Sequence, residues 1–141
     1  MTDIIPHRNL YTRLKAAANG VGVFAIRDIP NGLRLFVGDT GPVVRVPRAV
    51  VDQIQDVEVR RMYFDFCPMQ DNNFIAPRDF NQLTMAWYMN HSIDANVKID
   101  ESLQFSARRA IAIGEELTTD YTSFSEHALY LVAQWEMHWK T

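Results

Sequence analysis

Two stretches decide how this chain folds: Trp87-Tyr88-Met89-Asn90-His91-Ser92-Ile93-Asp94-Ala95-Asn96 and Gly114-Glu115-Glu116-Leu117-Thr118-Thr119-Asp120-Tyr121. Each fits ordinary structure when taken alone. A buried Asn or His held by backbone groups is common, and a Tyr at the end of a strand is often half-buried with its hydroxyl satisfied locally. Their meaning therefore depends on the sequence around them.

The length and composition indicate one domain. The 141 residues are 48% hydrophobic, enough for one core, and no apolar run approaches the ~20 residues of a membrane helix. The N-terminus lacks the build of a signal peptide. The single Cys67 and four scattered histidines give neither a disulfide nor zinc-ligand spacing. We expect a soluble intracellular protein without a metal, cytoplasmic or, in a eukaryote, nuclear.

Charge is unevenly placed along the chain. Residues 89–126 contain three basic and seven acidic side chains, a net charge of −4 (3 − 7), whereas the whole chain carries −3. An acidic field favours a cationic partner and disfavours direct binding of nucleic acid. A solvated acidic face that has no function is the alternative interpretation.

The segment before the two stretches reads as β structure. Residues 1–18 have little pattern and predict a loosely attached lead-in, with helical character around Leu14 to Ala18. Gly20-Val21-Gly22 then runs into an apolar strand; the glycines indicate either a turn or bulge, or a close approach of backbone to a ligand. Alternation over 33–37 and the apolar run 43–46 predict two more strands, paired locally as hairpins.

The middle of the chain mixes predicted helix and strand. Pro47 and the spacing of apolar residues to Val57 predict a helix. Residues 62–66 predict a strand or buried turn, 73–77 a strand, 79–87 a short helix capped by Asp79, and 96–100 and 103–108 two strands. The pattern Ala25-x-Arg27-x-Ile29-x-x-Gly32 recurs as Ala107-x-Arg109-x-Ile111-x-x-Gly114, which indicates two related β units. Ser123 and Glu126 fit a capping box before a C-terminal helix.

In this order, Gly20-Val21-Gly22, Asn90-His91-Ser92 and Glu116-Leu117-x-x-Asp120-Tyr121 resemble the signatures of SET-domain protein-lysine methyltransferases. The resemblance spans roughly residues 19–125. It implies a mainly β, β-clip-like fold of small sheets with a pseudoknot, a mid-chain helical insert and a C-terminal helix. The expected organisation is a lead-in over 1–18, the SET domain over 19–125, and a helix over 126–141 that packs on it.

The resemblance also implies a function, which is transfer of a methyl group from S-adenosylmethionine to a lysine side chain of a protein. Tyr121 is the implied catalytic residue. The implied cofactor-binding residues are Gly20, Val21, Gly22, Asn90, His91 and Trp135, and the implied substrate channel is lined by Tyr63, Thr119 and Phe124. The expected substrate is a basic protein (histone, histone-like or ribosomal), and a homodimer is a further expectation because flanking substrate-binding domains are lacking.

The sequence departs from the family pattern at several positions. Trp87 stands where the family has Arg, Ile93 where it has Cys, and Thr119 where many members have Phe or Tyr. No cysteine follows Cys67, so the zinc-binding cysteine cluster of many members is absent from this sequence. These losses keep two alternatives open: a catalytically silent SET-like module that binds a basic peptide, and a purely structural β domain.

Overall fold

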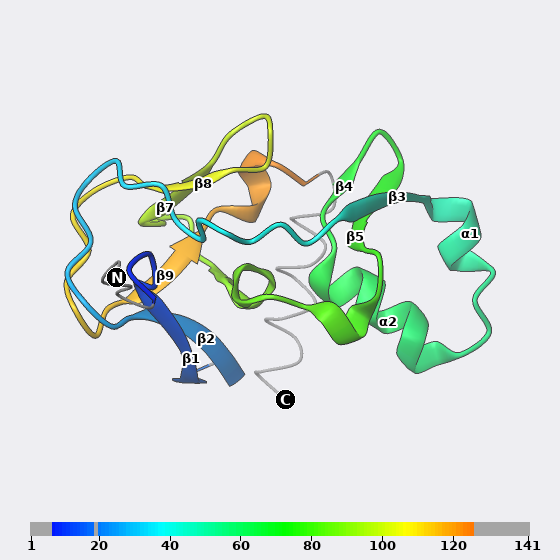
Figure 1. Ribbon diagram of the computed structural model, residues 1–141. Coiled ribbons are helices and arrows are strands. Elements are labelled where there is room, and N and C mark those ends of the chain that lie inside the picture. The colour runs from blue at the N-terminus through cyan, green and yellow to red at the C-terminus, as the bar shows by residue number, and fades with distance from the viewer. Residues whose placement is uncertain (1–6, 19, 126–141) are drawn as a thin grey trace, which may run out of the picture.

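The computed structural model describes residues 7–18 and 20–125, and its strands form two sheets. One sheet has six strands in the order β1-β2-β9-β7-β8, with β6 also paired to β9, and the other has the order β3-β5-β4. The two sheets lie at opposite ends of the molecule (Figure 1). The fold is therefore mainly β with few helices, as predicted.

The first strand lies where the sequence indicated a loose lead-in. β1 (Thr12–Ala17) pairs antiparallel with β2 (Gly20–Ala25) along its whole length, from Thr12↔Ala25 to Ala17↔Gly20. The helical character predicted around Leu14 to Ala18 is wrong. Good helix formers occupy this segment, but pairing with β2 decides its conformation, as tertiary context often does.

The predicted hairpins between residues 20 and 46 are also wrong. Residues 33–37 form no regular strand and make only the isolated bridge Arg34↔Ser106. The repeated units instead pair with each other. Ile29 and Ile111 exchange both backbone hydrogen bonds at 2.8 Å, Gly32 N–H donates to the carbonyl of Ala107, and Gly114 N–H donates to that of Ala25. The two segments with the similar sequence pattern therefore pair with each other.

The smaller sheet and its helices form the mid-chain insert. It contains β3 (Val43–Pro47), α1 (Arg48–Asp52), α2 (Val57–Phe66), β4 (Met69–Gln70) and β5 (Asn73–Pro77). The prediction of a strand or buried turn at 62–66 is wrong, because these residues continue α2. The carboxylate of Asp56 caps that helix by accepting from the N–H groups of Glu58 and Val59. The helix predicted from Pro47 is the short α1.

Two 3-10 turns, η1 (Phe80–Gln82) and η2 (Met85–Tyr88), replace the predicted short helix; Asp79 caps η1 as expected. The chain continues into β6 (Asn90–His91), β7 (Val97–Ile99), β8 (Phe105–Ala107), β9 (Glu116–Thr119) and η3 (Tyr121–Ser123). Ser123 therefore lies inside a 3-10 turn. The predicted C-terminal helix over 126–141 and its cap partner Glu126 fall outside the described residues.

β9 lies at the centre of the larger sheet and under a chain crossing. It pairs in parallel with β6 through His91↔Thr119 and in parallel with β7 through Val97↔Thr119. A strand residue has one neighbouring strand on each side, so His91 and Val97 lie on opposite edges of β9. Residues 92–96 must cross over β9 to join them. This crossing is the one that the pseudoknot prediction requires.

Each end of the molecule has its own core. Around the large sheet, Val23, Ile29, Val97, Ile111 and Leu117 are almost fully buried. In the insert, Val51, Cys67, Met69 and Phe74 are buried and the aromatic rings of α2 pack on them. No helix within the described residues is long and apolar enough to cross a membrane, and those residues hold no cluster of metal-ligating side chains.

Candidate active site

The crossing brings the two signature stretches together. Asn90 and His91 of β6 lie beside Thr118 and Thr119 of β9, and Tyr121 follows directly after. His91 contacts Tyr121 twice: its Nδ1 accepts the backbone N–H of Tyr121 at 3.0 Å, and the two ring centroids are 5.2 Å apart. Asn96 ties the crossing to β9, since its Oδ1 accepts the N–H of Thr118 and its Nδ2 donates to the carbonyl of Glu116.

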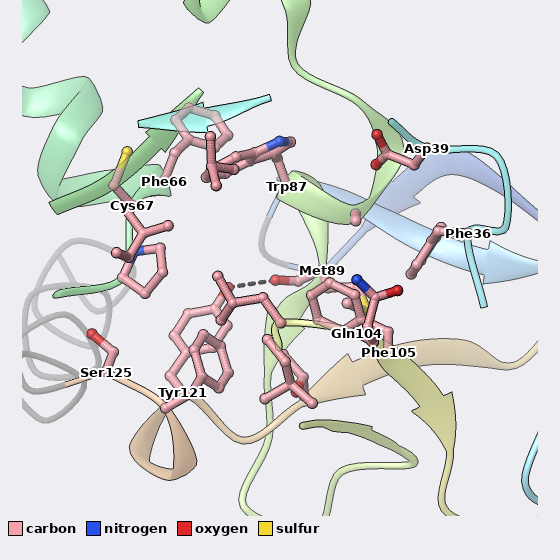
Figure 2. A pocket seen from close by; sticks show the side chains of 18 of the residues that line it. Phe36, Asp39, Phe66, Cys67, Trp87, Met89, Gln104, Phe105, Tyr121 and Ser125 are labelled. Atoms are coloured by element: carbon pink, nitrogen blue, oxygen red, sulfur yellow. Dashed lines mark hydrogen bonds between the residues drawn. The ribbon is translucent and has the colours of Figure 1, made fainter. Parts of the chain in front are cut away.

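Tyr121 makes hydrogen bonds through both its backbone N–H and its side-chain hydroxyl. Its hydroxyl donates a short hydrogen bond to the backbone carbonyl of Met89, drawn as the dashed line in Figure 2. Burial, and to a smaller extent the negative charge of Glu116, raise the pKa of this phenol above its ordinary value. The phenol is therefore protonated near neutral pH, and its hydrogen is already engaged in the hydrogen bond to the carbonyl of Met89. What it can offer a bound group is an acceptor oxygen.

Tyr121 and Thr119 face a cavity of about 260 Å³. Its other walls come from both ends of the molecule: Phe66 and Cys67 from the insert side, and Gln104 and Phe105 from the β7–β8 hairpin (Figure 2). Most of the lining is apolar or aromatic. Asp39 and Asp65 supply the charge, and no Lys or Arg belongs to the described lining. Such a cavity suits a long apolar chain that ends in a cation.

Thr119 has a hydroxyl without a partner. Its side chain is 2% exposed, and its Oγ1 makes no hydrogen bond within the described residues. Thr119 lines the cavity, and its role in a substrate channel stays a prediction. Phe124 also lines the cavity, with its ring 6.0 Å from that of Tyr121.

Tyr63 does not lie in the predicted channel. Its ring packs edge-on against Phe74 and Phe80 in the insert core, so the channel prediction for this residue is corrected to core packing. Because α2 is a helix and not a strand, Asp65 reaches the pocket instead. Sequence reasoning missed Asp39, which lies in a loop without any motif. Trp135 falls outside the described residues.

The Gly-x-Gly segment packs against Asn90. The Nδ2 of Asn90 donates to the carbonyl of Val21 at 3.2 Å and to Oε2 of Glu116 at 2.7 Å. Gly22 faces this pair closely: a Cβ there would lie 2.5 Å from Oε2 of Glu116 and 3.1 Å from Nδ2 of Asn90. Gly20 has a backbone φ of 104°, a conformation that favours glycine. Backbone conformation thus favours glycine at position 20, and a side chain at position 22 would displace the Glu116 carboxylate.

These residues fit the amino-acid end of S-adenosylmethionine. Val21 and Glu116 occupy both donors of the Asn90 amide, and no described residue donates to its Oδ1. That free oxygen is an acceptor that matches an ammonium group. The site therefore offers one acceptor that fits the ammonium group of such a cofactor.

Within the described residues 89–125, no acidic side chain lines the cavity. Glu115 pairs with Arg109 at 2.8 Å. Burial opposes ionisation of Glu115, but hydrogen bonds from Asn96, Ala112 and Arg109 outweigh it and lower the pKa of this carboxyl. Asp120 lies 3.9 Å from the imidazole of His91. The cavity charge therefore comes from Asp39 and Asp65, earlier in the chain.

Comparison with known protein families decides the identity of this arrangement. The SET domain family model matches residues 20–122, which include all three signatures and most of the chain. The chain belongs to the SET-domain family. No curated protein sequence matches the chain.

Solved structures share the fold of this SET domain. A Plasmodium falciparum "putative histone methyltransferase" is 17% identical, with a TM-score of 0.54 over 79% of this chain and 92% of that one. The structure "ctPRC2 in an autoinhibited conformation bound to S-adenosylmethionine" is 20% identical, with a TM-score of 0.55 over 87% of this chain. A humanized mutant of the Chaetomium thermophilum Polycomb Repressive Complex 2 is 23% identical, with a TM-score of 0.55 over 84%. This SET domain spans 16% of each of the two latter chains.

Proposed function

We propose that this SET domain transfers a methyl group from S-adenosylmethionine to a lysine side chain of a protein. The observation that carries the proposal is the position of Tyr121. Its phenol faces an apolar cavity, and the contacts of the same residue to Met89 and His91 join that cavity to the Asn90 segment. Membership of the SET-domain family supports the same reaction.

Four residues would hold the cofactor. Oδ1 of Asn90 accepts from the ammonium group, and the backbone of Gly20, Val21 and His91 supplies the remaining polar contacts. When bound, S-adenosylmethionine would supply a methyl group on a sulfonium sulfur, and the electron pair of the C–S bond would stay on sulfur when the methyl passes to the lysine nitrogen. Alignment and electrostatics then account for most of the rate enhancement, because the transfer is an in-line displacement.

The cavity prepares the lysine nitrogen for attack. Free lysine has a pKa of ~10.4, and the amine must lose one proton to be nucleophilic. The apolar walls favour the neutral amine by desolvation, while Asp39 and Asp65 in the lining favour the protonated form. Tyr121 cannot take the proton as a base, because its phenol keeps its own. Its oxygen instead accepts a hydrogen bond from the amine and orients the lone pair, and the released proton passes to water.

The second candidate is a silent module that binds a basic peptide. The observation that favours it is the replacement of the family Arg and Cys by Trp87 and Ile93. Trp87 lines the cavity, which could therefore hold a lysine side chain without catalysis.

Two measurements separate these functions. Calorimetry with S-adenosylmethionine should show binding by the full chain at millimolar cofactor or below. Incubation with methyl-labelled cofactor and a panel of histones and ribosomal proteins should then transfer label to at least one of them. Cofactor binding without transfer to any basic protein would favour the silent module, and absence of cofactor binding would contradict the proposed function.

A further inference from the structure

Glu116 occupies an unusual place beside the cofactor-facing residues. It lies in β9, paired with Phe24 of β2, so its backbone is fixed by the sheet. Its carboxylate extends over Gly22, where any larger residue would place a Cβ 2.5 Å from Oε2. The absence of a side chain at Gly22 therefore creates the space that the Glu116 carboxylate fills.

The contact with this carboxylate allows only one orientation of the Asn90 side-chain amide. A carboxylate accepts hydrogen bonds and cannot donate when ionised, so the Asn90 atom 2.7 Å from Oε2 must be the Nδ2 donor. The second hydrogen of the same amide donates to the carbonyl of Val21. Glu116 and Val21 together leave Oδ1 of Asn90 as the free atom.

Glu116 has no countercharge in the described part of the chain. No Lys, Arg or His of residues 7–18 and 20–125 lies within 4.0 Å of it. Its neighbour Glu115 differs, since that carboxylate binds Arg109 and Asn96. The two consecutive glutamates thus have separate roles: one closes a structural ion pair, and the other is directed at Asn90.

We infer that Glu116 is a positioning residue for the cofactor. It holds the Asn90 carboxamide with Oδ1 turned toward the ammonium group of S-adenosylmethionine. The inference rests on the proposed function, because it concerns the same cofactor site. Without the Glu116 carboxylate, only the longer 3.2 Å contact with the carbonyl of Val21 holds the amide. Rotation of the amide then presents its NH₂ group to a cation, which repels it.

Calorimetric titration of the full chain with S-adenosylmethionine tests this role. Glu116→Ala should raise the Kd about tenfold, the size expected when a hydrogen bond to a charged group is lost. Glu116→Gln should stay within about threefold of the natural protein, since its side-chain oxygen accepts the same bond. Glu116→Asp keeps the charge but is one methylene shorter, so it should give the loss seen with Ala.

Two comparisons exclude a general effect on folding. Glu115→Ala is the matched control and should leave the Kd unchanged. In an Asn90→Ala background, Glu116→Ala should cause no further loss, because the residue through which it acts is gone. Thermal unfolding checks that each variant is folded; if Glu116→Ala does not fold, the Asp and Gln variants carry the same comparison.

The outcomes are distinct. An unchanged Kd in Glu116→Asp or in folded Glu116→Ala overturns the inference, and so does a tenfold loss that persists in the Asn90→Ala background. A failure of the natural protein to bind S-adenosylmethionine would instead contradict the proposed function.

Discussion

The hydroxyl groups of Tyr121 and Thr119 belong to the lining of the same cavity, yet their hydrogen bonding differs. Tyr121 donates to the carbonyl of Met89, whereas the buried Oγ1 of Thr119 has no partner in the described residues. One hydroxyl is therefore held in a defined orientation, and the other is buried at a cost to stability. Removing the hydroxyl of Tyr121 should lower the rate of methyl transfer, whereas removing the hydroxyl of Thr119 should raise the stability of the fold.

Tyr121→Phe should abolish most of the methyl transfer. The change removes the oxygen that orients the amine but keeps the ring and the backbone contact to His91. We expect turnover to fall roughly a hundredfold or more, as when one positioned polar group is removed from an active site, with the Kd for S-adenosylmethionine little changed. Label transfer and calorimetry measure the two quantities. Tyr88→Phe, outside the cavity lining, is the control; an unchanged rate in Tyr121→Phe would remove Tyr121 from catalysis.

Thr119→Val should stabilise the protein. Valine has nearly the same shape and removes a buried hydroxyl that has no partner, whose burial costs about 1–3 kcal/mol. We expect the free energy of unfolding to rise by about 1 kcal/mol in chemical denaturation. A drop in stability would mean that Oγ1 is hydrogen-bonded in solution, for example to a water in the cavity.

At this scale, the resemblance to SET domains predicted which residues meet, but not their contacts. Asn90, His91 and Tyr121 come together as expected. Tyr63 and Asp65 could not be told apart, because their direction depends on whether 62–66 is strand or helix. The partner of Asn90 could not be predicted either, since the link to Glu116 depends on how β6 lies beside β9.

Among the elements, the two related β units pair with each other next to β2 and β9. We call these two segments, residues 25–32 and 107–114, the clasp; the backbone hydrogen bonds between Ile29 and Ile111 join them. Both isoleucine side chains are 1% exposed and belong to the larger core. Because the two units pair with each other, the same apolar and glycine positions recur in both of them.

Ile29→Val and Ile111→Val should each lower the free energy of unfolding by about 1 kcal/mol, the usual cost of one methylene lost from a core. Ile113→Val offers a matched control in the same segment, because Ile113 is 64% exposed and should change stability by less than about 0.5 kcal/mol. Urea denaturation measures all three. Equal effects at Ile111 and Ile113 would show that the clasp does not contribute to the core.

The mispredicted elements have different causes, non-local strand pairing in one case and helix propagation in the other. Residues 14–17 contain helix-forming residues but become part of β1, because the edge of β2 is available. Residues 62–66 are aromatic, as strands often are, yet they continue a helix that Asp56 caps. The β7–β8 hairpin was predicted correctly because its two strands are adjacent in sequence.

For the molecule as a whole, the distribution of charge predicts the kind of substrate. The cavity lies between the two ends of the fold, and the charged residues of its described lining are Asp39 and Asp65. The net charge of the chain has the same sign. A lysine flanked by basic residues therefore approaches a favourable field, to which the acidic residues of 89–125 add from outside the cavity.

Methylation of matched peptides tests this prediction. A peptide with the target lysine flanked by Lys or Arg should have a lower KM than one flanked by acidic residues, and an alanine-flanked peptide should lie between them. The differences should shrink at high salt, since the Debye length is ~8 Å at physiological ionic strength and shorter above it. Equal KM values at low salt would show that the acidic residues are only solvated surface.

The crossing of residues 92–96 over β9 also determines when the protein can fold. During synthesis, β1, β2 and the whole insert leave the ribosome before β9, which is the central strand of the larger sheet. Until residue 119 has emerged, β2 lacks one of its two neighbouring strands, and His91 and Val97 lack their pairing with Thr119. Such long-range pairing makes folding slow. Until that point the chain therefore has neither its central strand nor Tyr121 in place.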